Sequence, residues 1–162
     1  MATCCSRWCR NHWSTLLVGF TIPAALLYLA WKQDRREDSA RFHELLRHAQ
    51  EEYCRSINTG APFTIKIYLD QAADLVDEVS LVPMDYLTLA SVGTTVWSHD
   101  RVHEYAMESA RLGREKEDPI EQYAAQLVLG HIDFNRYLES KRDTYLVEAR
   151  EHFDAARDLV DD

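Results

Sequence analysis

Glycine and proline are scarce in this sequence, with 5 Gly and 4 Pro among 162 residues. An all-β domain turns about every ten residues and relies on these two residue types to do so. Apolar residues nevertheless make up 46% of the chain, so a core can form. The sequence therefore predicts an all-α protein, with length for one ordinary domain.

Cysteine is also scarce, with 4 in the chain, most of them near its N-terminus. Cys4, Cys5 and Cys9 precede the main apolar stretch, and only Cys54 follows it. A single cysteine cannot close a disulfide within the distal domain, and no Asn-x-Ser/Thr acceptor occurs, so nothing indicates an oxidising, extracellular setting. Palmitoylation, oxidative pairing and unreactive thiols all remain open for the three N-terminal cysteines.

Acidic residues are absent from the first 31 residues, which carry only Arg7 and Arg10 as formal charges. Because the whole chain has a net charge of −9, these two positive charges leave −11 on residues 32–162. So acidic a segment repels nucleic-acid backbones and anionic lipid headgroups, which excludes nucleic acid as a partner. A basic protein partner and plain solubility both remain open.

Residues 14–31 contain no charge, and this length predicts a transmembrane helix. A short basic flank, 1–13, precedes it, and a charged linker, 32–38, follows. In a helix Trp13 and Trp31 lie about 27 Å apart, close to the roughly 30 Å of apolar bilayer, so the two indoles suit the two interfaces. Membrane lipid is therefore an expected partner.

Three other interpretations of this segment fit the sequence less well. A signal peptide is disfavoured because residues 28–30 make a poor cleavage site, and a buried core helix because no polar stripe faces solvent. A mitochondrial targeting sequence fits the basic start but has too short a flank. Gly19 and Pro23 predict a kink and close approach of another membrane helix, although a lone kinked anchor touching only lipid is equally compatible.

Residues 39–162 show apolar residues at helical spacing in six stretches, which are 42–57, 65–79, 86–97, 102–113, 123–138 and 146–160. Asp118, Pro119 and Glu121 together predict a helix start, with Asp118 as the N-cap. Many stripe positions carry Ala or Gly, so paired helices must approach closely. The pattern predicts three stacked antiparallel hairpins, while a non-repeating helical bundle stays open.

The hairpins resemble the tetratricopeptide repeat, whose second helix has Ala, a large residue four positions on, and Ala three further on. Ala149, Phe153 and Ala156 have this spacing. Looser matches are Ala106, Ala110 and Gly113, then Ala72, Val76 and Val79, and the family's Leu-Gly pair is matched by Leu129 and Gly130. No Trp opens a first helix, and the distance from Leu129 to Ala149 is longer than the family's. The resemblance implies a concave surface for a peptide or subunit, without catalysis.

Candidate catalytic and metal motifs fail on spacing. His43 and His48 are five residues apart, which puts their rings about 140° apart on a helix, so they cannot bind one ion from one face. A di-iron site needs two Glu-x-x-His pairs on facing helices, and only Asp100 and His103 approach this spacing. The sequence predicts no catalytic, cofactor or metal site, and we expect the protein not to be an enzyme.

The leading expectation is an accessory or assembly subunit of a multi-subunit membrane complex that contacts other subunits, including their transmembrane helices. The acid-free basic start before an anchor favours the mitochondrial inner membrane, in a respiratory-chain or ATP synthase assembly. The alternative is a membrane-anchored receptor or adaptor whose concave face binds basic targeting peptides or chaperone tails.

Overall fold

The computed structural model describes the backbone of residues 4–59 and 63–161, and the side chains of 24–56 and 63–160. Within these residues all regular structure is helical, so the all-α prediction is confirmed. The helices are α1 (Cys4–Thr59), α2 (Phe63–Ala73), α3 (Pro83–Gly93), α4 (His99–Glu115), α5 (Pro119–Ser140) and α6 (Asp143–Asp161).

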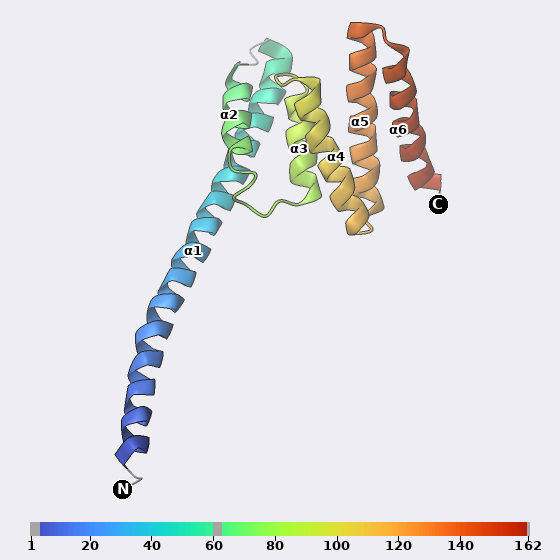
Figure 1. Cartoon of the computed structure of the whole chain (residues 1–162). Helices are drawn as coiled ribbons and strands as arrows, with labels where there is room; N and C mark the ends of the chain where they lie inside the picture. Colours follow the sequence, from blue (N-terminus) through green and yellow to red (C-terminus); the bar gives the residue numbers. More distant parts are fainter. Residues whose placement is uncertain (1–3, 60–62, 162) are drawn as a thin grey trace.

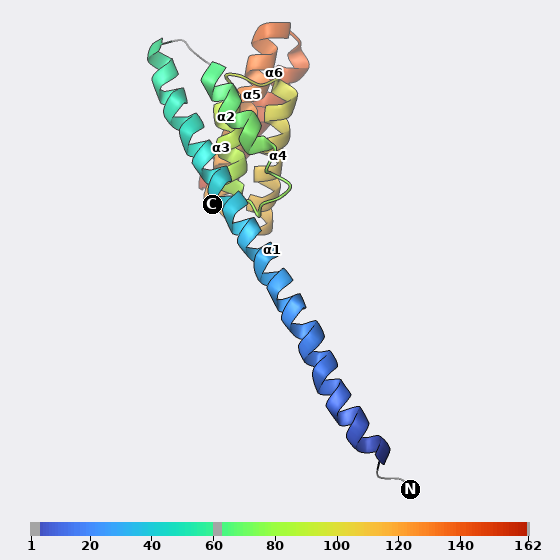
Figure 2. The same cartoon turned by 90° about the vertical axis from the view of Figure 1, so that its left-hand side faces the viewer.

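Successive helices run in alternating directions and pack as neighbours (Figures 1 and 2). α1 packs on α2, α3 on α4 and α5 on α6, while α4 also packs on α5. Less extensive contacts of α3 with α1, α2 and α5 join the pairs. The described chain is thus a row of three helix hairpins.

Helix α1 extends well beyond the domain that its C-terminal part joins (Figures 1 and 2). Residues 24–37 are all exposed, and α1 first enters the core at Phe42. The charged stretch 32–38 continues the helix instead of breaking it. Its polar side chains suit an exposed helix, since Gln33 Nε2 donates an i,i+4 hydrogen bond of 3.2 Å to Glu37 Oε1.

Within the described part of the chain, no helix combines the length and apolar character needed to cross a membrane. Trp13, Gly19 and Pro23 from the expected anchor lie outside the residues whose side chains the structure describes. Trp31 is described and exposed, with its ring centroid 5.9 Å from that of Tyr28 and the Arg35 guanidinium 4.8 Å from it.

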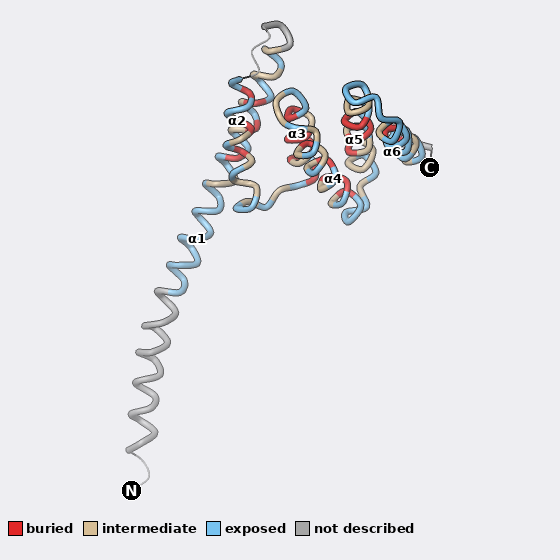
Figure 3. Tube along the Cα trace, turned by 45° about the horizontal axis from the view of Figure 1, so that its top comes forward, coloured by how far each residue is buried: buried red, intermediate tan, exposed pale blue. Residues whose placement is uncertain are grey.

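The buried residues form two clusters along the row of hairpins (Figure 3). The first joins α1, α2 and α3 and contains Phe42, Leu46, Ala49, Ile65, Leu69, Ala72, Leu89 and Val92. The second joins α3, α4 and α5 and contains Leu87, Ala90, Val102, Ala106, Ala110, Ala125, Leu129 and Ile132. Because both clusters include α3, this helix couples the first hairpin to the rest.

The predicted start of α5 is confirmed: Asp118 is the N-cap and its Oδ1 accepts hydrogen bonds from the backbone N–H groups of Ile120 and Glu121. The predicted end of the second helix at residue 79 was wrong, because α2 ends at Ala73. Tight i to i+3 bonds, from Leu75 N to Ala72 O and from Val76 N to Ala73 O, turn the chain there. Val76 therefore lies in a turn.

Candidate interaction groove

The residues assigned to repeat packing lie mostly at helix interfaces. The buried ones are Ala72, Ala106, Ala110, Gly113, Leu129, Gly130, Ala149 and Ala156. Val76 is half-buried against the first cluster. Phe153 is 37% exposed, but its ring lies over Gly130. Most of these side chains position the helices, while Val76 also lines the groove described next and Phe153 borders a hollow on α5 and α6.

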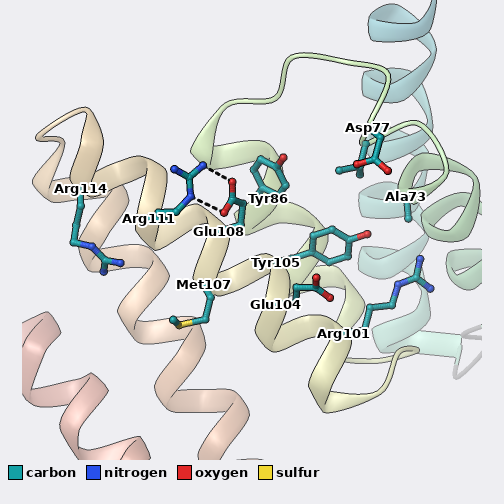
Figure 4. Close-up of a pocket in the computed structure, with 11 residues that line it drawn as sticks. Ala73, Asp77, Tyr86, Arg101, Glu104, Tyr105, Met107, Glu108, Arg111 and Arg114 are labelled. Atoms are coloured by element: carbon teal, nitrogen blue, oxygen red, sulfur yellow. Dashed lines mark hydrogen bonds and ion pairs between the residues drawn. The ribbon is translucent and has the colours of Figure 1, made fainter.

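A groove of about 610 Å³ lies where α2, the turn after it, α3 and α4 meet (Figure 4). One face of α4 supplies most of its lining. The lining residues are Ala73, Val76, Asp77, Tyr86, Arg101, Glu104, Tyr105, Met107, Glu108, Arg111 and Arg114. Because helical hairpins place these positions on one side of the row, the groove follows from the packing.

Aromatic rings form a row beside the groove. The ring centroids of Tyr86 and Tyr105 are 6.3 Å apart, and those of Tyr105 and Trp97 are 5.5 Å apart. The Arg101 guanidinium lies 4.0 Å from the Trp97 ring centroid, within cation–π range. The row gives the groove a rigid wall with phenol hydroxyls at its surface.

Asp70 of α2 fixes one end of this row. It accepts hydrogen bonds from Trp97 Nε1 at 2.7 Å and Arg101 Nη1 at 3.0 Å, and it pairs with Lys66 at 2.6 Å. Burial alone raises the pKa of Asp70, but the hydrogen bonds from Lys66 and Trp97 and the charges of Lys66 and Arg101 lower it overall. The carboxylate thus ties α2 to the start of α4.

Glu108 and Arg111 form a two-bond ion pair within the groove (Figure 4). Arg111 Nε lies 2.8 Å from Oε2, and Nη2 lies 2.6 Å from Oε1. The hydrogen bond from Arg111 lowers the pKa of Glu108. Burial, followed by the charges of Glu108 and Asp77, raises the pKa of Tyr86, so its phenol stays protonated and can donate a hydrogen bond.

The groove carries balanced charge. Its three carboxylates, from Asp77, Glu104 and Glu108, are matched by three guanidinium groups, from Arg101, Arg111 and Arg114. The acidity of the whole domain is therefore not concentrated here. Carboxylates, guanidinium groups, phenols and the exposed Met107 bind by ion pairs, hydrogen bonds and apolar contact, which suits a protein segment of mixed character.

A second surface lies at the C-terminal end of the row, on α5 and α6. Leu127, Phe153 and Val160 border a hollow of about 280 Å³ and are 37%, 37% and 67% exposed. Ile120 nearby in the chain is 74% exposed. Such clustered apolar side chains are typical of protein contact surfaces.

No family model, curated protein or solved structure matches this chain. The likeness to tetratricopeptide repeats thus stays a prediction from the sequence.

The sequence did not single out the groove residues. Tyr86 and Tyr105 lie within the predicted apolar stretches 86–97 and 102–113, yet both are only half-buried. A usable signal was present: Arg101, Glu104, Glu108 and Arg111 recur at helical spacing on α4, opposite the buried Val102, Ala106 and Ala110.

Proposed function

We propose that this protein is a membrane-anchored, non-catalytic accessory or assembly subunit of a multi-subunit membrane complex. Residues 14–31 are its anchor, and the hairpins, which resemble tetratricopeptide repeats, are its protein-binding domain. The mitochondrial inner membrane is the proposed compartment because a basic, acid-free start precedes the anchor.

The observation that carries this proposal is the exposed apolar stretch of α1. Leu26, Leu27 and Leu29 are 60%, 72% and 58% exposed, on a helix that projects from the domain (Figure 1). Burying one large apolar side chain is favourable by about 1.5–3 kcal/mol. Since the domain does not cover these residues, lipid or a neighbouring helix is the surrounding that stabilises them.

The groove supports the proposed role of the hairpins as a protein-binding domain. It combines the aromatic wall of Tyr86 and Tyr105 with charged groups of both signs, which is the composition of a protein contact site. The apolar hollow beside Phe153 offers a separate contact. Two separate surfaces, one on α2 to α4 and one on α5 and α6, suit a subunit that touches two neighbours.

The receptor alternative gains less support. Capture of basic peptides calls for excess negative charge along the groove. The groove instead matches three carboxylates with three guanidinium groups, and Glu108 is already paired with Arg111. We therefore favour a stable subunit over a receptor for basic peptides.

Native gel electrophoresis of membranes solubilised in a mild detergent tests the proposal, because it measures the size of the assembly that contains the protein. We expect the tagged full chain to migrate in an assembly far larger than its own 18.8 kDa. The charge swap E104R/R114E changes two exposed groove residues and should release the chain from the assembly. A small species for the wild-type protein contradicts the proposal.

The matched control is R150E/E151R, which makes the same swap on exposed residues of α6. It should co-migrate with the assembly as the wild type does. If control and groove variants behave alike, the groove is not the contact surface.

A further inference from the structure

Three side chains of metal-binding type converge from three helices, away from the groove. They are His103 of α4, Asp133 of α5 and His152 of α6, and their ligand atoms all lie within 4.8 Å of one another. Helices α4 and α6 each pack on α5 and not on each other. The cluster therefore links two helices that otherwise lack direct packing.

Asp133 lies at the centre and is 1% exposed. Its Oδ1 is 3.3 Å from Nη1 of Arg136, whose other nitrogen pairs with Asp100. Its Oδ2 is buried without a hydrogen-bond donor and lies 3.5 Å from Nε2 of His152, longer than an ordinary hydrogen bond. A buried, unpartnered carboxylate oxygen is costly unless it faces a cation.

The ring of His152 is oriented by Gln126. Its Nδ1 lies 2.7 Å from the Gln126 Oε1, which can only accept a hydrogen bond. Nδ1 therefore carries the proton, and in the neutral ring Nε2 presents its lone pair toward Asp133 Oδ2. Two lone pairs at this distance repel each other unless a positive charge lies between them. An outer partner that fixes the tautomer in this way is usual for metal-binding histidines.

His103 completes the set from α4. Its side chain is half-buried, and a ring nitrogen lies within 4.8 Å of ligand atoms of both Asp133 and His152. Imidazole nitrogen is a usual ligand of zinc-class ions.

We propose that His103, Asp133 and His152 bind one divalent transition-metal ion of the zinc class. Two imidazoles and one carboxylate are a usual donor set for zinc, and a tetrahedral ion places its ligand atoms about 3.3 Å apart, which small side-chain rotations reach here. The His152 side chain, 24% exposed, gives the ion a path from solvent. The bound ion links α6 to α4 through its ligands. This proposal does not depend on the function proposed above.

Zinc titration of the chelator-stripped full chain in detergent, in competition with a chromophoric chelator, tests the site. We expect one equivalent to bind, with H103A, H152A and D133N each weakening binding at least about tenfold. Q126A should weaken it by about 10–100-fold through loss of the orienting hydrogen bond. Cobalt substitution should give the visible absorption of a four-coordinate ion.

The matched control is H131A, which removes an exposed histidine of α5 and should leave zinc affinity unchanged. Circular dichroism of each variant shows whether the helices persist, and H103A and Q126A keep the test valid if D133N unfolds. Zinc should raise the melting temperature of the wild type and not of H103A. Equal zinc affinity for the wild type and H103A/H152A overturns the proposal, and so does the absence of a one-to-one zinc complex.

Discussion

A Cβ atom added to Gly130 of α5 would lie 2.7 Å from Cε1 of the Phe153 ring of α6. Real Cβ atoms essentially never approach so closely, so the last hairpin depends on a glycine at this position. On either side of Phe153, Ala149 and Ala156 are buried to 1% exposure. Small residues thus allow the ring of Phe153 to lie flat between the two helices.

We predict that G130A destabilises the protein by about 0–2 kcal/mol. Displacing the Phe153 ring costs about 1–3 kcal/mol, and the better helix propensity of Ala offsets about 1 kcal/mol of it. In the F153A background the clash is gone, so the same substitution should stabilise by about 1 kcal/mol. Urea unfolding of the four proteins measures both values. Stabilisation by G130A in both backgrounds would show that the close contact is absent.

Asp70 should make stability depend on pH in acid. Its pKa is lowered in the folded state, because the hydrogen bonds and charges of its partners outweigh burial. Its contribution is therefore fully present above the ordinary carboxyl pKa and is lost as the pH falls through the lower folded-state pKa. We predict that D70N is less stable than wild type at neutral pH and that the difference shrinks below about pH 4.

Urea unfolding across a pH series measures this difference. The control is D74N, which changes an exposed aspartate one turn later in the chain. It should show a small difference from the wild type at every pH. A D70N difference that stays constant down to the lowest pH argues against the Asp70 contacts with Trp97 and Arg101.

The N-cap of α5 should contribute about 1 kcal/mol. Asp118 Oδ1 accepts from Ile120 N at 3.0 Å and Glu121 N at 3.1 Å, and D118A leaves both donors without this partner. We expect D118A to lower the free energy of unfolding by about 0.5–2 kcal/mol and D118S to retain most of it. Equal stability of D118A and wild type would mean that solvent replaces the cap without loss.

Local signals in the sequence accounted for much of the fold. The stripe of Ala106 and Ala110, both about 1% exposed or less, identified the buried face of α4, and Asp118 followed by Pro119 located the start of α5. These features depend on residues within a few positions of each other, so periodicity and capping chemistry reveal them. The end of α2 was missed because apolar residues continue past Ala73 into the turn, where Val76 packs on the core without being helical.

The spacing of residues along the sequence could not reveal the candidate sites. The zinc-class cluster joins His103, Asp133 and His152, which lie on three separate helices, and the sequence offered no local motif for them. His103 was considered only with Asp100, which pairs with Arg136 instead. The groove similarly depends on the angle between hairpins, which is set by side-chain packing and not by helical periodicity.

Alkaline carbonate extraction of cell membranes that contain the full chain measures whether α1 holds the protein in lipid. We predict that the wild-type protein stays in the membrane pellet and that a larger fraction of the variant L26E/L27E/L29E appears in the supernatant. A charge change at exposed positions of the domain, R150E/E151R, should leave the pellet fraction unchanged. Recovery of the wild-type protein in the carbonate supernatant would contradict membrane anchoring by α1.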